Sequence, residues 1–391
     1  MKNKVLHFIR KISQVDSSFI KNQIICHLEF EPSLVFRKND INSTCHSIKG
    51  LNLRAENCLD LSENETFLEK IRYRTNKTLS NRQIKLTEDI IQKDGIDICH
   101  FHYGTDCGIF YPLLKRIKIP SIVSFYGYDA FSFPKRFYSY GKKYLHNRVF
   151  SKIDCILAMS PEMKKDLIKV GCPSEKIEVH YHGVPSSIFN GIKKTYSQVN
   201  NEFTLLNISY FDPVKGHKFI FTALKQLIER GSKIRLRIGG NGFYELKLKE
   251  YVDNNKLGEF ISFLGPLKYG SKEMINEYNN ADAFIYPSVI TKDDKEGIPG
   301  AIVEAMFAGL PVISTYHGGI PFIIENEKTG LLVKEWDIVG LASAIKKLIL
   351  DKKLREQIGK AGQEYALKYL DIAEKERKLE DIYNKLIDDW R

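Results

Sequence analysis

Two glutamates of a kind that binds sugar hydroxyls, Glu296 and Glu304, stand eight residues apart in the segment EGIPGAIVE. Pro299 suits the first turn of a helix and Gly309 suits the position just after its end, so the segment predicts a helix of about ten residues. Glu304 falls in the middle of that helix, and the small Gly300 lies one turn earlier on the same face, leaving room for a ligand. The two carboxylates can therefore accept hydrogen bonds from two parts of one polyhydroxylated ligand.

Each glutamate also has a purely structural interpretation. Glu296 ends the charged run DDKE and can be a solvated loop residue. Glu304 interrupts the apolar run AIVEAMFAG, where an unpaired buried carboxylate would be unusual, so it can instead be paired with a Lys or Arg of the core.

Glycine-rich turns and one lysine favour a phosphate site in the same half of the chain. The segment TYHGG ends a predicted strand, and the amides of Gly318 and Gly319 can face phosphate oxygens. Lys215 stands between a predicted strand and a predicted helix, from where it can reach the same phosphates. The turn GGNG at 239–242 follows another strand, but Glu245 occupies the third glycine place of the dinucleotide fingerprint. Any one of these turns can also be only a turn.

These residues are positioned by strands and helices that alternate along the whole chain, which predicts α/β architecture with parallel sheets. The predicted helices include 218–230, 272–279 and 338–350. The predicted strands are short apolar runs, at 5–9, 96–102, 121–125, 155–159, 177–180, 203–209, 234–238, 261–264, 283–286, 311–315 and 331–333.

A polar stretch at 185–202 divides the pattern, and we place the interdomain linker there. The expected organisation is one Rossmann-like domain at 1–190, a second Rossmann-like domain at 191–370, and a last helix at 371–391 that returns to the first domain. Ligands of such sheets bind at the carboxyl ends of the strands, so we expect an interdomain cleft there.

Composition excludes several classes of protein. The 391 residues are 43% hydrophobic and 27% charged, with a net charge of +11, which fits a globular protein with anionic partners. A run of 18 apolar residues is absent, and the first residues resemble a strand more than a signal peptide. Seven scattered cysteines without a CxxC pair indicate reduced thiols and a cytoplasmic protein.

The order of these motifs resembles the retaining, nucleotide-sugar-dependent glycosyltransferases of family 4, which have the GT-B fold. The resemblance runs along nearly the whole chain and is most specific in the segment with the two glutamates. The opening SQVDSSFIKNQI resembles members that build exopolysaccharide, capsule or lipopolysaccharide. The other matching pieces are HFHYG at 100–104, FYGYDA at 125–130, HGV at 182–184, VKGH at 214–217, GGNG at 239–242, FLG at 263–265 and YPS at 286–288.

The resemblance implies a role for each matching residue. Glu304 would hold the ribose hydroxyls of the donor, and Glu296 would hold the transferring sugar. Lys215 would neutralise the departing diphosphate. The second domain would bind the nucleotide sugar, with further donor contacts from the loop of Gly297, Ile298, Pro299 and Gly300, from Gly318 and Gly319, and from the turns at Gly242 and Gly265 near the base. The first domain would be the acceptor side, with His102, Tyr126 and Asp129.

Three departures from the family pattern favour an alternative. Ser209-Tyr210 stands where the family usually has Gly-Arg, so a second phosphate-binding cation is missing. Tyr126 replaces a usual His, and Phe322 a usual Glu. The alternatives are a non-catalytic sugar-nucleotide-binding partner subunit, or a GT-B nucleotide-sugar epimerase or phosphorylase.

The expected reaction moves a hexosyl group from a nucleoside-diphosphate sugar to a glycan acceptor, lipid-linked as on a polyprenyl diphosphate. Cations and amides can stabilise the leaving diphosphate without a metal. The motif Asp-x-Asp does not occur, which argues against a metal-chelating transferase, so we expect no metal and no cofactor. Attack on the same face, with a donor phosphate oxygen taking the acceptor proton, would retain the configuration.

Two further features of the first half have several interpretations. His100 and His102 alternate on a predicted strand and project to one face, for a structural or substrate-contact role or, with ligands that the sequence does not identify, a metal. The segment 133–152 mixes aromatic residues with six Lys or Arg. It predicts either a helix packed through Phe137, Tyr140, Tyr144 and Leu145 or contact with anionic lipid at the inner face of the plasma membrane. No nucleic-acid-binding motif accompanies the charge, which argues against that partner.

Overall fold

A computed structural model of the chain describes residues 2–40, 51, 53, 55–192, 194–196, 202–292 and 294–391. The chain forms two compact units, the first from residues 1–183 and 372–391 and the second from 184–371. The predicted boundary at 190/191 is therefore wrong by seven residues, because the chain from Val184 onward already packs with the second unit. Of the predicted linker, residues 193 and 197–201 lie outside the described part.

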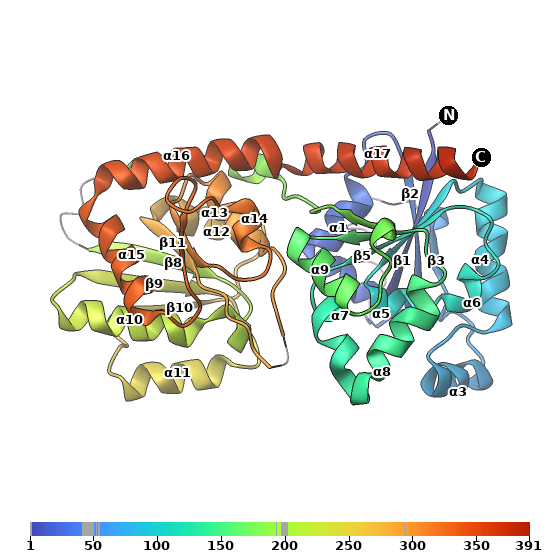
Figure 1. The fold of residues 1–391 in the computed structure, drawn as a ribbon, viewed down its shortest axis with the longest axis horizontal. Helices are drawn as coiled ribbons and strands as arrows, with labels where there is room; N and C mark the ends of the chain where they lie inside the picture. Colours follow the sequence, from blue (N-terminus) through green and yellow to red (C-terminus); the bar gives the residue numbers. More distant parts are fainter. Residues whose placement is uncertain are drawn as a thin grey trace. The chain divides into compact units, whose positions relative to one another are not determined.

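The first unit is built on a seven-stranded parallel sheet with the order β3-β2-β1-β4-β5-β6-β7 (Figure 1). Its register pairs Val5 with Ile98 and with Pro32. The strands are β1 (Lys4–Lys11), β2 (Glu31–Lys38), β3 (Cys58–Asp60), β4 (Ile98–His102), β5 (Ser121–Phe125), β6 (Cys155–Ala158) and β7 (Ile177–Val179).

Helices connect these strands in the way that parallel pairing requires. The α-helices of the first unit are α1 (Ser18–Ile25), α3 (Phe67–Asn76), α4 (Asn81–Asp94), α5 (Gly104–Cys107), α6 (Tyr111–Leu114), α7 (Tyr128–Phe131), α8 (Arg136–Leu145), α9 (Pro161–Lys169) and α17 (Ile372–Trp390). Short helical turns are η1 (Ile12–Asp16), η2 (Ala55–Asn57), η3 (Phe133–Lys135), η4 (His146–Phe150) and η5 (Ser174–Lys176).

The C-terminal helix α17 packs on the first sheet (Figure 1). Leu379, Tyr383 and Ile387 recur every four residues along one helix face and are buried against Val5 and Ile98 of the sheet. This apolar face explains why the last helix belongs to the first unit although the second unit separates it from the other elements in sequence.

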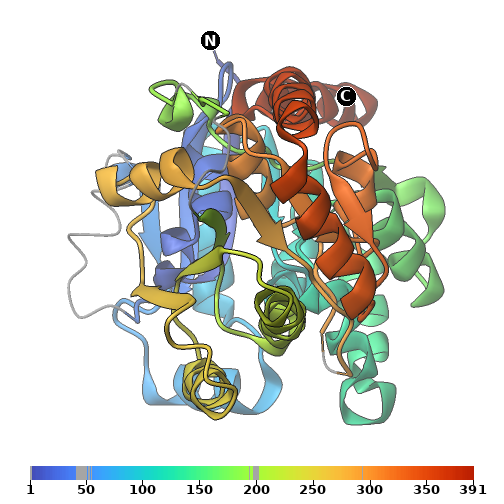
Figure 2. The ribbon, with the colours of Figure 1, turned by 90° about the vertical axis from the view of Figure 1, so that its left-hand side faces the viewer.

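The second unit has a six-stranded parallel sheet of order β10-β9-β8-β11-β12-β13. Helices α10 and α15 pack together in its largest buried cluster, while α13 packs on α16; Figure 2 views this unit end on. The strands are β8 (Phe203–Ile208), β9 (Ile234–Gly239), β10 (Ile261–Gly265), β11 (Ala283–Tyr286), β12 (Val312–Thr315) and β13 (Leu331–Val333). The helices are η6 (Ser186–Phe189), η7 (Pro213–Lys215), α10 (His217–Glu229), α11 (Glu245–Asn254), α12 (Lys272–Asn280), α13 (Gly300–Phe307), α14 (Ile320–Ile323), α15 (Ile338–Leu350) and α16 (Lys352–Tyr369).

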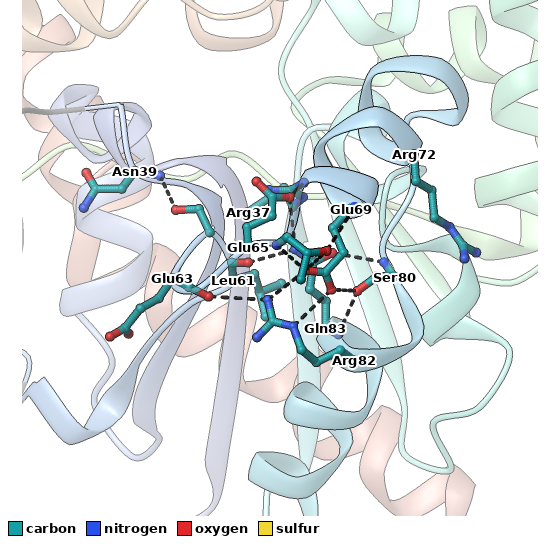
Figure 3. A network of polar contacts seen from close by, with 12 residues as sticks. Arg37, Asn39, Leu61, Glu63, Glu65, Glu69, Arg72, Ser80, Arg82 and Gln83 are labelled. Atoms are coloured by element: carbon teal, nitrogen blue, oxygen red, sulfur yellow. Dashed lines mark hydrogen bonds and ion pairs between the residues drawn. The ribbon is translucent and has the colours of Figure 1, made fainter.

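A network of charged side chains connects β2 with the segment between β3 and α4, which the sequence patterns do not resolve (Figure 3). Arg37 of β2 is almost fully buried, pairs with Glu65 and stacks over a tyrosine ring. Glu69 of α3 accepts hydrogen bonds from Ser80 and Arg82 near the start of α4, and these contacts hold the pKa of its carboxyl near 2 against the raising effect of burial. The network thus joins β2, α3 and α4 through polar contacts, although α3 buries no apolar face.

Both sheets change winding direction at one pair of adjacent strands. In the first sheet this point lies between β1 and β4, and in the second between β8 and β11. Loops leave such a pair in opposite directions and open a crevice at the carboxyl ends, which is where ligands bind in open parallel sheets. The segments after β8 and β11 contain Lys215 and Glu296 respectively.

Candidate active site

Lys215 and Glu296 form an ion pair at the winding reversal of the second sheet. Lys215 ends the turn η7 after β8, Glu296 lies in the loop between β11 and α13, and Nζ is 2.5 Å from Glu296 Oε1. Both side chains are about 85% buried, at 15% and 14% exposure. The structural interpretation of Glu296 as a freely solvated loop residue is therefore wrong.

The surroundings of Lys215 keep its charge in place. Burial alone lowers the pKa of a lysine, but the Glu296 carboxylate and the nearby Tyr286 hydroxyl outweigh it and raise the pKa of Lys215 above its ordinary value. The ammonium group lies 5.7 Å from the centroid of the Tyr286 ring. Ser288 donates to the other Glu296 oxygen at 3.3 Å. The site thus presents a permanent cation beside an oriented carboxylate.

His317 fixes the backbone of Glu296, a role that the sequence does not reveal. Its Nε2 accepts the Glu296 amide at 3.0 Å, and its Nδ1 lies 2.8 Å from Glu335 Oε1. Because Nε2 is the acceptor, Nδ1 carries the proton and donates to Glu335. The other Glu335 oxygen accepts the amide of Ile290 at 2.6 Å, so one carboxylate ties both ends of the loop after β11.

Gly318 allows two loops to touch. Its φ is +51°, and a Cβ there would lie 2.1 Å from the Glu296 carbonyl oxygen. Gly319 donates its amide to the Gly297 carbonyl at 3.0 Å. The predicted use of the Gly319 amide for phosphate is therefore wrong for this structure, because that amide already joins the two loops.

Glu304 lies buried in α13, with 8% exposure, one turn after Gly300. Its Oε2 accepts a hydrogen bond from the Tyr278 hydroxyl of α12 at 2.7 Å. The expected core Lys or Arg partner is thus replaced by a neutral hydroxyl, and burial raises the pKa of Glu304 to about 7. A Cβ added at Gly300 would lie 3.9 Å from Glu304 Oε1, so the glycine keeps space beside that oxygen.

The predicted helix start is also confirmed. Pro299 is the N-cap residue of α13, Gly297 and Ile298 belong to the loop before it, and the helix ends before Gly309, which has a φ of +71°. The loop from Glu296 therefore leads directly to the helix N-terminus, where backbone amides point out of the helix.

The turns at Gly242 and Gly265 lie at the carboxyl ends of β9 and β10. A Cβ at Gly242 would lie 2.5 Å from the Phe211 carbonyl oxygen, whereas Gly265 has a φ of +73° and open space around it. Tyr210 and Phe243 beside these turns are exposed, with ring centroids 6.3 Å apart. Two exposed aromatic rings and an open turn suit a planar base.

The predicted acceptor-side residues lie at the carboxyl edge of the first sheet, but two of the three are buried. Asp129 accepts the amides of Gly104, Tyr126 and Gly127 at 2.8 to 3.1 Å, and burial raises its pKa to about 6. It holds the loops after β4 and β5 together. His102 is fully buried, whereas Tyr126 is partly exposed.

His100 and His102 project to one face as predicted, and the structure adds His7 from β1, which the sequence does not single out. Nitrogens of the three rings lie within 4.8 Å of one another, a spacing that a metal could bridge. These nitrogens are instead directed at each other and at further polar groups: His7 and His102 are 3.0 Å apart, and His100 contacts Tyr383 and Ser124. The cluster is a hydrogen-bonded network.

In the second unit, then, the structure brings Lys215, Glu296 and Glu304 together around Tyr286. Tyr286 is the common neighbour, because the charges of Glu296, Lys215 and Glu304 all influence the pKa of its phenol. Tyr278, His317 and Glu335 are the supporting residues that sequence reasoning missed. None of the described helices has the length and apolar character of a membrane-spanning segment.

The sequence matches two family descriptions, Glycosyltransferase Family 4 over residues 65–187 and Glycosyl transferases group 1 over residues 190–365. It is 29% identical over 373 residues to the putative colanic acid biosynthesis glycosyltransferase WcaL of Escherichia coli K12, covering 88% of this chain and 89% of that protein. It is 31% identical over 255 residues to the amylovoran biosynthesis glycosyltransferase AmsK of Erwinia amylovora, covering 65% and 61%. The structure of Anabaena HepE in complex with UDP has a TM-score of 0.77 at 17% identity, covering 98% of this chain and all of that one.

Proposed function

We propose that this chain, which belongs to the GT4-like glycosyltransferases of the GT-B fold, transfers a hexose from a nucleoside-diphosphate sugar to a glycan acceptor during cell-surface polysaccharide biosynthesis. The names of WcaL and AmsK support the polysaccharide class. The observation that carries the donor chemistry is the buried Lys215–Glu296 pair at the winding reversal of the second sheet.

Different residues of the second unit bind different parts of the donor. Glu304 accepts the ribose hydroxyls, and Glu296 with the loop to Gly300 accepts the hydroxyls of the transferring sugar. Lys215 stands beside Glu296 and meets the negative charge that develops on the departing diphosphate. The cation is held before the reaction starts, so its orientation costs little when the bond breaks.

The proposed stereochemical course is retention. The nucleophilic hydroxyl attacks the face from which the diphosphate leaves, and a leaving phosphate oxygen takes its proton, so no separate base is needed. Lys215 and the loop amides supply the electrostatic stabilisation without a metal. The product should therefore carry the anomeric configuration of the donor, which NMR of the purified product measures.

Thermal shift with nucleoside diphosphates tests the donor site. We expect one of UDP, GDP, CDP and ADP to raise the Tm by several degrees and NAD to have no effect, because a ligand at 100 times its Kd adds about 2.7 kcal/mol. The shift should survive EDTA. A response to NAD alone, or to none of the five, would contradict the proposal. A shift without transfer to any acceptor would support the alternative of a non-catalytic binding subunit, which the Tyr210 and Tyr126 departures favour.

A lipid-linked acceptor at the inner face of the membrane is the second part of the proposal. In and around α8, Tyr138, Tyr140, Lys142 and Lys143 are exposed, whereas Tyr144 and Leu145 are buried. The helix is thus anchored through only part of its predicted apolar face; the burial of Phe137 lies outside the described side chains. Basic residues near anionic lipid contribute about 1 kcal/mol each.

Cosedimentation with vesicles measures this contact. The chain is expected to pellet with phosphatidylglycerol-containing vesicles at low salt and to be released at high salt, because the attraction is screened. The variant Lys142→Glu/Lys143→Glu should lose most of the binding. The matched variant Lys352→Glu/Lys353→Glu on α16, with the same charge change, should keep it. Equal binding of both variants, or none by the wild type, would contradict membrane contact through α8.

A further inference from the structure

A continuous line of hydrogen-bonding side chains crosses the first unit from α17 to the carboxyl edge of the sheet. His27 Nδ1 lies 2.6 Å from Glu376 Oε1, and His27 Nε2 lies 2.8 Å from His7 Nε2. His7 Nδ1 lies 3.0 Å from His102 Nε2, and His102 Nδ1 lies 2.7 Å from the Tyr126 hydroxyl. One ion pair and three hydrogen bonds therefore join a buried carboxylate to a partly exposed phenol.

Because the line is buried, the donor and acceptor roles of its members are coupled from one link to the next. Both His7 and His102 are fully buried, and each ring nitrogen of the two contacts another member of the line. A neutral imidazole has one donor and one acceptor nitrogen, so the tautomer of one ring dictates that of the next. Two arrangements satisfy the line, with all donors pointing toward Tyr126 or all pointing toward His27.

The charge of His27 selects between the two arrangements. Burial lowers the pKa of His7 and of His102, which are therefore neutral, whereas Glu376 and Glu380 outweigh burial and raise the pKa of His27 to about 9. A cationic His27 donates from both nitrogens, so His7 and His102 each carry a proton on Nδ1 and His102 donates to Tyr126. The Tyr126 hydroxyl then donates to Gln23 Oε1, the contact observed at 2.6 Å.

A neutral His27 reverses every link. With its one proton directed at Glu376, its Nε2 accepts from His7, His7 accepts from His102, and His102 accepts from Tyr126. A half-turn of the Gln23 amide would then place Nε2 against the tyrosine oxygen; within the described residues this Nε2 has no hydrogen-bond partner. The two states differ in whether Tyr126 donates its proton to Gln23 or to His102.

The groups that face His27 come from every element packed on it. Glu376, Glu380 and Tyr383 come from α17, His7 comes from β1, and the ring of Phe30 lies 6.4 Å away. Glu380 also accepts the amides of Leu28, Glu29 and Phe30, which fixes the loop that carries His27. His100 lies beside the line, and its contacts to Tyr383 and Ser124 leave it outside the relay.

We propose that His27, His7 and His102 form a hydrogen-bonded relay in which the charge of His27 sets whether the Tyr126 hydroxyl donates its proton to Gln23 or to His102. The three histidines are positioning residues that act through Tyr126.

Tautomer measurement by two-bond proton–nitrogen NMR on ¹⁵N-histidine-labelled protein tests the relay without any substrate. At pH 7 we expect a doubly protonated His27 and the Nδ1–H tautomer of both His7 and His102. Raising the pH through about 9 should switch His7 and His102 to the Nε2–H tautomer together, while His100 stays unchanged. A neutral His27 at pH 7, or tautomers that do not follow its charge, would overturn the proposal.

Variants of α17 provide the second measurement. Glu376→Gln removes the nearest carboxylate from His27 but leaves Glu380, so it should lower the pH at which both tautomers switch, whereas Glu374→Gln on the same helix should leave that pH unchanged. If Glu376→Gln does not fold, the pH titration of the wild type decides alone. Stoichiometric zinc retained through gel filtration would also overturn the relay, because ligated nitrogens cannot pass on a hydrogen bond.

Discussion

Lys215→Ala is expected to lower kcat for sugar transfer about 100-fold, the scale of removing one group that stabilises developing charge. The KM for the nucleotide sugar should change much less, because the ground-state diphosphate keeps its contacts with the loop amides. The effect should be large here because Tyr210 stands where the family pattern has a second cation. Steady-state kinetics with the nucleotide sugar selected by thermal shift measures both constants.

A stability control separates the two roles of the lysine. Removing one partner of a buried ion pair costs about 3 to 5 kcal/mol, so Lys215→Ala also lowers the Tm by leaving Glu296 uncompensated. The double variant Lys215→Ala/Glu296→Gln removes that lone charge and should recover much of the Tm but none of the activity. Lys218→Ala, which removes a cation lying over the Tyr244 and Tyr251 rings, should keep the wild-type kcat. Near-normal transfer by Lys215→Ala would contradict the assigned role.

The fold was predictable because the central strands β4, β5, β6, β11 and β12 are buried at every residue, and buried parallel strands appear as short apolar runs. Each strand expected from such a run has its counterpart in the two sheets. The exceptions are β2 and β3. Strand β2, with the sequence EPSLVFRK, contains Pro32 and the buried Arg37, and its charge is balanced by Glu65 from a distant loop. A local sequence pattern cannot predict a strand whose buried arginine pairs with a glutamate 28 residues away.

The reacting groups of the donor site were predictable from the sequence, whereas the residues that hold them in place were not. Glu296, Glu304 and Lys215 stand in motifs with fixed spacing, whereas Tyr278 and His317 act through contacts between elements that only the folded sheet brings together. The same holds for His7, which is an ordinary position on an apolar strand until β4 places His102 beside it. Supporting residues carry no periodic signal, because their partners are set by strand order.

Glu304→Gln is expected to stabilise the protein without ligand. The pKa of Glu304 is raised from 4.5 to about 7 by burial, so the folded state favours the protonated carboxyl. A group whose pKa is raised on folding stabilises the folded state at pH values below its pKa in the unfolded state. This stabilisation is lost as the pH rises through its pKa in the folded state. Above pH 7 the free energy of unfolding of the wild type is therefore reduced, on the order of 3 kcal/mol, by the buried charged carboxylate. Glutamine carries no charge and keeps an acceptor for Tyr278.

The Tm difference between Glu304→Gln and the wild type should therefore be near zero at pH 4.5 and grow to a plateau above pH 7. The exposed Glu250→Gln on α11 is the matched control and should show no such rise. A Glu304→Gln variant that is less stable than the wild type at pH 8 would contradict the assignment of an uncompensated buried carboxylate.

The same substitution should weaken nucleoside diphosphate binding by about 10- to 100-fold at pH 8, because hydrogen bonds to a charged acceptor contribute about 1.5 to 3 kcal/mol. Below pH 7 the wild type protonates and its affinity should fall toward that of the variant, which isothermal titration across pH measures. A residue kept for packing would lose stability on substitution and leave binding unchanged. Only a carboxylate that is retained for a ligand predicts higher stability and lower affinity from one atom's replacement.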